Sequence, residues 1–473
     1  MTLSEKLQEI RQSDVIVRIN GFINSKYMLA LLAIFTLLSN VFSLELWLYA
    51  FVGAVGLYIC LFGKDMLFLA PAFIFMYISP SKKNNPFNWD TAIYHQLGVQ
   101  LFFIITISVF VLLFVFRIAT DYGFMSVLKK KRKLSLGLLL LTAAFFLGGL
   151  GYSQYDPQNI VYCAVLFVCF FLLYFILTGT VQWRDVSKDY WAWLGLFVGF
   201  TVVLQLVNVY LVNDVLRDGE IFRGNIYTGW GQYPPMAAVL LLCLPCPFYL
   251  AATKKLGFIF NLLGCGIFLA IVATTSRAAM LFGALILAAC AIVTLFVKKN
   301  RIQNAIVYGV LAVGVLVVAA CFWPEIKKIF TALIELGIYD NGRGELYTEA
   351  LQRFICSPLF GQGFFACSPD RWQYNPGEFN LLPYFWHNTL IQMLATSGII
   401  GLTAYLFHRL QTLLLIVQKP NLAKIFIGLS VLGMLLVCLL DCHIFNVGVT
   451  FMYTVFLTFA EATEEMENSQ NRE

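Results

Sequence analysis

The chain has 473 residues, of which 60% are hydrophobic and 12% are charged, and its formal net charge is +6 at pH 7. Soluble domains are typically about 45–50% apolar and about 25% charged, so this composition excludes a soluble globular protein and indicates a polytopic membrane protein. The positive charge requires no nucleic-acid partner, because cytoplasmic loops of membrane proteins are enriched in Lys and Arg.

The chain begins with a segment of mixed charge, MTLSEKLQEIRQSDVIVRIN, and its first apolar run starts only near Tyr27. A cleaved secretory signal has a different order, since its apolar core follows the basic residues directly. We therefore expect residues 1–26 to form an amphipathic cytoplasmic stub.

Apolar runs of bilayer-crossing length, about 17–25 residues, recur along the chain. They fall at 27–44, 46–62, 98–118, 134–151, 160–179, 189–212, 234–251, 256–274, 278–297, 304–323, 388–407, 422–440 and 444–460. A shorter run at 66–79 is also expected to cross. The pattern predicts an all-α polytopic membrane protein of about 12–14 transmembrane helices, with a bundle over 27–323 and C-terminal helices over 388–460.

Lys and Arg gather in alternate loops, and this orients the chain because they favour short cytoplasmic loops. The strongest cluster is KKKRK at Lys129 to Lys133. With that loop inside, alternation also places inside Arg184, Lys188, Lys254, Lys255, 298–301, Arg409, Lys419 and Lys424. Only Lys82 and Lys83 fall on the wrong side. Both termini are then cytoplasmic, including the acidic tail at 461–473.

The outer face receives the longest polar stretch, from Trp323 to His387. Loops of such length are usually functional or disordered, and the motifs GRGELY, GQGFF and PYFWHN favour a packed structure. We predict an ordered extracytoplasmic loop subdomain at 324–387. Its Cys356 and Cys367 could form a disulfide if they meet in an oxidising compartment.

Arginines on this outer face run against the positive-inside trend. They are Arg217, Arg223, Arg277, Arg343, Arg353 and Arg371. For Arg353 and Arg371 we expect pairing with acids of their own segment. Arg277 has no acidic neighbour in its turn and could snorkel to lipid headgroups, but a guanidinium also binds phosphate in a bidentate way. Arg223 and Arg343 lie beside glycines, which let a ligand approach the backbone. An anionic ligand at the outer face accounts for these last three arginines.

His387 stands at the mouth of an apolar run. Imidazole can take up a proton near neutral pH, and the following Asn388 can hydrogen-bond the histidine or a substrate. Alternatively, His387 has only a structural role, as a polar helix cap in an aromatic belt at the membrane interface. The residues alone leave both interpretations open. His443, in the triplet DCH, has the elements of a metal ligand set, but a lone triplet at a helix turn is more often structural.

The segment HNTLIQMLATSGIIG resembles the signature of the O-antigen ligase and polymerase superfamily, which has His, then Asn, Ser or Gln, nine residues, Gly, two residues, and Gly, Thr or Tyr. The matching residues are His387, Asn388, Gly398 and Gly401.

Two upstream segments strengthen the resemblance. GRGELYTEALQRFICSPLFGQGFF is similar to a segment of the same family in which an arginine opens a helix that ends in a proline and a Gly-x-Gly turn, here Arg343, Pro358, Gly361 and Gly363. SRAAMLFGALILA is similar to the family's serine-arginine pair at the start of a membrane helix. The resemblance extends over residues 223–401.

The resemblance implies a GT-C-like, metal-independent, inverting glycosyltransferase on the outer face of the bacterial inner membrane. The donor would be a glycan on undecaprenyl pyrophosphate, and the acceptor a glycan, lipid or protein hydroxyl. His387 would accept or orient the acceptor proton, and arginines would clamp the phosphates. The catalytic candidates are His387, Arg277 and Arg343, and the substrate-binding candidates are Arg217, Arg223, Tyr347 and Asn388. No cofactor is expected, and the sequence has no Asp-x-Asp motif and no phosphate-binding glycine loop.

Two alternatives stay open. The family contains both ligases and polymerases, and the sequence does not separate them. The rival class is a lipid-linked glycan flippase or polysaccharide transporter, which should carry polar or broken helices near the membrane midplane. Here the polar groups gather at the outer interface and no internal repeat is evident, so we favour the transferase.

Overall fold

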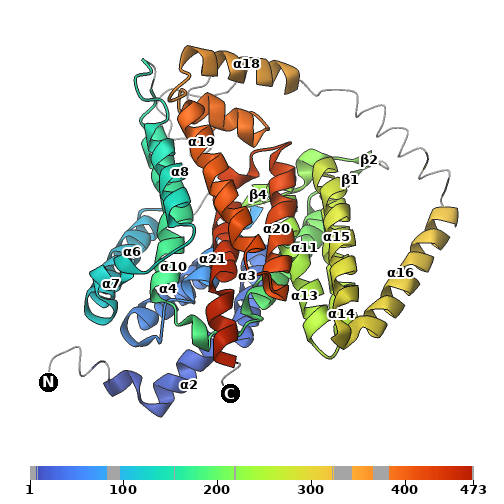
Figure 1. Ribbon diagram of the computed structural model, residues 1–473, viewed down its shortest axis with the longest axis horizontal. Coiled ribbons are helices and arrows are strands. Elements are labelled where there is room, and N and C mark those ends of the chain that lie inside the picture. The colour runs from blue at the N-terminus through green and yellow to red at the C-terminus, as the bar shows by residue number, and fades with distance from the viewer. Residues whose placement is uncertain are drawn as a thin grey trace.

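The protein folds as a bundle of helices (Figure 1). A computed structural model describes residues 9–82, 96–153, 155–217, 220–321, 343–365 and 383–470, with Leu7, Trp323 and Lys327. Strands in these ranges form two short antiparallel hairpins, which are β1 (Leu216–Arg217) with β2 (Glu220–Ile221), and β3 (Tyr227–Thr228) with β4 (Gly231–Gln232). Cys367 and Arg371 lie outside the described residues, so the disulfide and the pairing of Arg371 stay predictions.

Most elements are α-helices, as expected for apolar segments that must satisfy their own backbone hydrogen bonds in a bilayer. The helices before residue 213 are α2 (Asp14–Ile23), α3 (Lys26–Phe42), α4 (Glu45–Phe62), α5 (Leu69–Tyr77), α6 (Leu97–Arg117), α7 (Phe124–Lys129), α8 (Ser135–Leu147), α9 (Gln158–Phe167), α10 (Leu173–Thr180) and α11 (Tyr190–Val212). Those after it are α12 (Tyr233–Cys243), α13 (Pro245–Thr253), α14 (Gly257–Ala273), α15 (Arg277–Phe296), α16 (Arg301–Cys321), α18 (Arg343–Cys356), α19 (Thr389–Val417), α20 (Leu422–Cys438) and α21 (Val447–Gln470). Short π or 3-10 turns are η3 (Ile118–Tyr122), η4 (Val168–Leu172), η5 (Trp183–Asp185), η6 (Arg223–Asn225), η7 (Lys298–Asn300) and η9 (His443–Phe445).

The expected all-α polytopic membrane fold is confirmed. In the described part of the chain, seven helices are long and apolar enough to cross a membrane, and the pair α2 and α3, bent by 58°, makes an eighth if it counts as one span. Three further apolar helices, α8, α14 and α20, are shorter. The total of 12–14 crossings stays a prediction, because some expected crossings form short helices, such as α5 with nine residues.

The bundle has two distinct ends. Helix α2 and the C-terminal part of α21 lie at one end, and α18 covers the opposite end (Figure 1). We call these the α2 end and the α18 end. At the α2 end, Glu464 of α21 accepts from Lys133 at 3.0 Å and from the buried Lys424 at 2.9 Å. Two of the basic loops that the sequence assigned to the cytoplasmic side, those of Lys133 and Lys424, therefore contact α21. Helix α21 continues to Gln470 and so includes most of the expected acidic tail.

The apolar run at 388–407 does not form one straight helix, because α19 is broken at Gly398, which has φ 63° and ψ −159°. The segment that follows α18 fills the break. The N–H of Gly363 donates to the carbonyl of Thr396 at 2.9 Å, and the N–H of Ile399 donates to the carbonyl of Pro358 at 2.9 Å. Backbone groups that the broken helix leaves unpaired thus find partners in this segment, as a buried backbone requires.

Two glycines of the sequence motifs make this insertion possible. A Cβ added to Gly398 would lie 2.3 Å from the carbonyl oxygen of Leu359. A Cβ added to Gly361, which has φ +62°, would lie 2.4 Å from the carbonyl carbon of Thr396. Any larger residue at either position would push the backbone after α18 away from the backbone of α19. The motifs SGIIG and GQGFF therefore pack directly against each other, and this contact fixes the end of α18 against α19.

We expect Gly398→Ala to destabilise the protein. The backbone conformation at this position is almost restricted to glycine, and forcing another residue into it costs about 1–3 kcal/mol, to which the clash with Leu359 adds. The measurement is the thermal unfolding midpoint of the purified protein in detergent.

Gly266→Ala is the matched control, because an added Cβ there meets nothing within 4 Å. Equal midpoints for the two variants would contradict the proposed role of Gly398.

Candidate active site

His387 lies in the turn that leads into α19, and its backbone is left-handed, with φ 51°. This conformation is uncommon for a residue other than glycine and persists only where neighbours fix it. Asn388 caps α19, since its side-chain oxygen accepts from the N–H groups of Leu390 at 2.9 Å and Ile391 at 3.1 Å. From the other side, the hydroxyl of Tyr347 donates to the carbonyl of His387 at 3.3 Å. The imidazole is thus presented by a turn held at both ends.

A carboxylate holds the imidazole ring. Nδ1 of His387 lies 3.1 Å from Oδ1 of Asp441, which comes from the loop between α20 and α21. An ionised carboxylate only accepts hydrogen bonds, so Nδ1 carries the proton and Nε2 is the basic nitrogen. The His387 side chain is 45% exposed. The pair therefore offers a positioned base that an external hydroxyl can approach.

The Asp441 loop is fastened to the same turn. The side-chain amide of Asn388 donates to the carbonyl of Leu439 at 2.9 Å, and the hydroxyl of Thr389 donates to the carbonyl of Asp441 at 3.1 Å. The cap residue that starts α19 therefore also positions the carboxylate beside the histidine.

The charge state of Asp441 suits this role. Burial raises the pKa of its carboxyl, but the neighbouring His443 and the hydrogen bond from His387 outweigh burial and leave the pKa well below its usual range. Nε2 of His443 lies 3.5 Å from Oδ2 of Asp441. Burial lowers the pKa of His443, against the attraction of Asp441. Asp441 thus stays ionised at neutral pH, which keeps His387 in the orientation described.

Helix α18 contacts this turn through Tyr347. Arg343 opens the helix and lies four residues before Tyr347, so the two side chains share one helix face. Because the Tyr347 hydroxyl reaches the carbonyl of His387, that face of α18 is the one turned to the histidine. The structure therefore brings together three of the expected site residues, Tyr347, His387 and Asn388, at the junction of α18 and α19, and Arg343 lies one helical turn before Tyr347.

Arg353, farther along α18, has a different environment. Its guanidinium donates to Glu349 at 3.1 Å and to Gln362 at 3.1 Å, and it lies 5.4 Å from the centre of the Trp386 ring. The expectation that Arg353 pairs with an acid of its own segment is confirmed. This arginine holds α18 to the segment inserted into α19.

The other expected arginines come from separate elements. Arg277 is the first residue of α15 and is half-buried. Near it, at the end of α14, the carbonyl of Ala273 accepts a hydrogen bond from the hydroxyl of Tyr210 in α11, at 2.6 Å. Arg223 in η6 and Arg217 in β1 are exposed in the loop that follows α11. The contacts with the His387 turn described above come instead from Tyr347, Asn388 and Asp441.

Sequence reasoning missed Asp441. The triplet DCH drew attention only as a set of metal-ligand types, and its carboxylate instead contacts a histidine 54 residues earlier in the chain. The one available signal was an acidic residue in a short loop on the same face as His387, which on its own does not identify a partner.

Part of the chain matches a known family. Residues 262–406 match the family model described as O-antigen ligase. This range contains Arg277, Arg343, Tyr347, His387 and Asn388, whereas Arg217, Arg223 and Asp441 lie outside it. No curated protein matches the chain. The resemblance read from the sequence motifs is confirmed.

We expect Asn388→Ala to lower the thermal unfolding midpoint, because loss of a helix N-cap typically costs about 0.5–2 kcal/mol. Asn388→Asp is the matched control: it keeps the capping oxygen and loses only the amide donor to Leu439. An unchanged midpoint for the alanine variant would mean that the cap does not stabilise the turn.

Proposed function

We propose, from the match of residues 262–406 to the O-antigen ligase family model, that this chain is a glycosyltransferase of the O-antigen ligase and polymerase superfamily, which transfers a glycan from undecaprenyl pyrophosphate to an acceptor hydroxyl. The product would be a surface polysaccharide such as O-antigen, capsule or exopolysaccharide. The observation that carries the proposal is the His387–Asp441 pair, a half-exposed imidazole oriented by a carboxylate at 3.1 Å.

The proposed reaction is a single inverting displacement. The acceptor oxygen forms a bond to the anomeric carbon of the donor sugar as the bond from that carbon to the pyrophosphate oxygen breaks. Nε2 of His387 takes the acceptor proton, and the imidazolium that results is stabilised by Asp441. General-base help of this kind typically contributes about 10²- to 10⁴-fold in rate. Undecaprenyl pyrophosphate leaves as an anion.

Arginines would stabilise the charge that develops on the pyrophosphate. Arg343 shares the Tyr347 face of α18, next to the base. Arg277 lies at the N-terminus of α15, where backbone N–H groups and the helix dipole also favour an anion. The exposed Arg223 and Arg217 would contact the donor farther out. Since arginines supply the positive charge, the proposed reaction requires no metal.

We place the protein in the bacterial inner membrane with the α18 end outside and both termini in the cytoplasm. The basic clusters at the α2 end support this orientation. The exception, Lys82, is held at the other end, where it donates to Asn213 at 3.3 Å and lies 4.9 Å from the centre of the Tyr227 ring. In this arrangement the bundle at 27–323 and the helices at 388–460 support the loop subdomain at 324–387.

We expect His387 to be essential for glycan transfer and Asp441 to be needed for a normal rate. In a reaction of purified protein with an undecaprenyl-pyrophosphate glycan and candidate acceptors, we expect His387→Ala to abolish transfer. Asp441→Asn should lower kcat by up to about 10²- to 10⁴-fold with little change in KM, because the imidazole loses its orientation.

Asp214→Asn is the matched control. This residue lies in a loop on the same side, is exposed, and adopts a positive φ of 48° that asparagine tolerates.

A ladder of products from the donor alone would identify a polymerase, and the addition of a single glycan to an acceptor would identify a ligase. Donor binding without transfer by the wild type would contradict the proposal and favour a flippase.

The two arginines of α18 should separate function from stability. Arg343→Ala is expected to lower kcat/KM by about 10- to 100-fold, the loss of a charge-assisted hydrogen bond, at an unchanged unfolding midpoint. Arg353→Ala should lower the midpoint, because it removes the contacts with Glu349, Gln362 and Trp386. The reverse pattern, a lowered midpoint for Arg343→Ala and full turnover, would remove Arg343 from the site.

A further inference from the structure

A polar cavity of about 630 Å³ opens at the α2 end, on the opposite side of the bundle from the His387 turn. Its size falls within the range of about 300–1,000 Å³ that is typical of small-ligand pockets. Its walls come from α2, the end of α4, the end of α6 with η3, and the loop around η5. The glycan-transfer site does not account for it.

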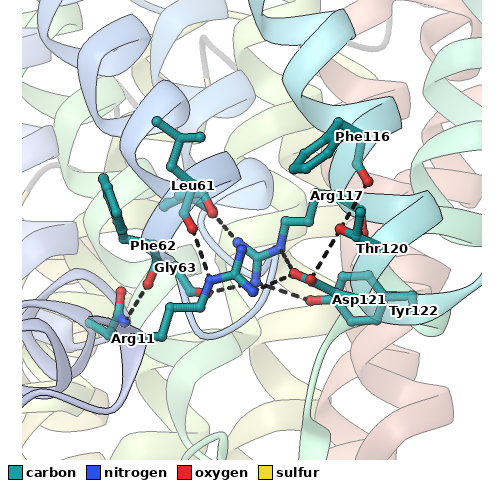
Figure 2. A network of polar contacts seen from close by, with 11 residues as sticks. Arg11, Leu61, Phe62, Gly63, Phe116, Arg117, Thr120, Asp121 and Tyr122 are labelled. Carbon is teal, nitrogen blue, oxygen red and sulfur yellow. Dashed lines mark hydrogen bonds and ion pairs between the residues drawn. The ribbon is translucent and has the colours of Figure 1, made fainter. Parts of the chain in front are cut away.

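One wall is a fixed network of charges (Figure 2). Arg117 is only 2% exposed, and its guanidinium donates to the carbonyl of Gly63 at 2.6 Å and to that of Ile59, at the C-terminus of α4. Asp121 accepts from Arg11 at 2.6 Å and lies 3.3 Å from Arg117. This network ties the residues before α2 to the ends of α4 and α6, so the wall is preformed.

Among the described residues, charges of both signs line the cavity in equal number. The cations are Arg11, Lys64 and Arg117, and the acids are Asp65, Asp121 and Asp185. The Lys64–Asp185 pair, at 2.6 Å, is about half-exposed, with the two side chains 43% and 51% accessible. Asp65 is deeply buried, and burial raises the pKa of its carboxyl. A lining of this kind suits a ligand that itself carries both charges and would place a cation near Asp65.

Side-chain amides add acceptors. Asn20 donates through its amide nitrogen to the carbonyl of Phe62 at 2.9 Å, and Asn24 donates to Asp65 at 3.2 Å. Both residues line the cavity. Each amide uses one of its two N–H groups in these bonds, so it keeps an oxygen that can accept from an ammonium group and an N–H that can donate to a phosphate.

The cavity lies beside a helix suited to the membrane surface. On α2, the apolar Val15, Val17 and Phe22 are 66%, 55% and 48% exposed, whereas Asn20 is buried against the bundle. The helix is bent by 58° from α3. A helix that exposes an apolar face at the end of a membrane bundle lies along the lipid interface. Val17 also lines the cavity, which therefore opens at the level of the lipid headgroups.

We propose that this cavity binds the headgroup of phosphatidylethanolamine from the cytoplasmic leaflet. The phosphate is bound by Lys64 and Arg11, and the primary ammonium by Asp65, Asp185 and the amide oxygens. A bound phosphate competes with Asp185 for Lys64. The ammonium of phosphatidylethanolamine then replaces Lys64 beside Asp185, whereas an anionic headgroup has no cation to do so and a trimethylated choline headgroup has no N–H to donate. This site is independent of the proposed transferase chemistry.

The test is lipid retention by the purified full-length protein, measured by native mass spectrometry. The probes are phosphatidylethanolamine, phosphatidylcholine and phosphatidylglycerol with identical acyl chains. Gly21→Phe fills the cavity mouth, where an added Cβ meets nothing within 4 Å, and Lys64→Ala removes a phosphate ligand. Gly266→Phe and Lys255→Ala are the controls; neither residue lines the cavity.

We expect preferential retention of phosphatidylethanolamine by the wild type and both controls. It should fall about tenfold in Lys64→Ala, as expected for one charge-assisted hydrogen bond, and be lost in Gly21→Phe. Equal retention of the three lipids, preference for phosphatidylglycerol, or undiminished binding by Lys64→Ala overturns the proposal. Lys64 is exposed enough to be replaced without unfolding, so this variant decides the question even if Gly21→Phe misfolds.

Discussion

The backbone hydrogen bonds across the break in α19 are the contact on which the candidate site depends. A break in a membrane helix exposes N–H and C=O groups that have no water to bind, and each unpaired group costs several kcal/mol. Here the segment 357–363 pairs with 395–400 and removes that cost. The same insertion ends α18 against α19, which fixes where Tyr347 meets the His387 turn.

The site itself is assembled from segments far apart in the sequence. Its histidine has an unfavourable backbone conformation, with φ 51°, of the kind that costs about 1–3 kcal/mol. The Asn388 cap, the Tyr347 hydroxyl and the Asp441 contact together offset this cost. Such a turn keeps its imidazole half-exposed while the ring stays oriented. Active sites commonly combine local strain with a rigid surround in this way.

The arginines at the two ends of the bundle differ in their surroundings. At the α2 end, the buried Arg117 donates to carbonyls at the C-terminus of α4 and pairs with Asp121, so its charge is compensated. Basic loops there also pair with α21. At the α18 end, Arg223 and Arg217 are exposed, and Arg343 opens α18 one helical turn before Tyr347, which contacts the His387 turn. The first arrangement suits a lipid interface, and the second suits an anionic substrate.

The sequence by itself determined the membrane class, most helix positions and the alternation of basic loops, because hydropathy and charge are local properties of the chain that decide how a segment partitions into a bilayer. It also singled out His387 as a candidate site residue. It also identified Gly398 and Gly361, though not that they touch. Only the tertiary structure decided that Asp441 contacts His387, that Arg353 binds Glu349 and Gln362, that Tyr347 reaches the His387 turn, and that α19 is broken. These facts depend on contacts between distant segments, and no periodicity within one helix encodes which loop of another helix it will meet.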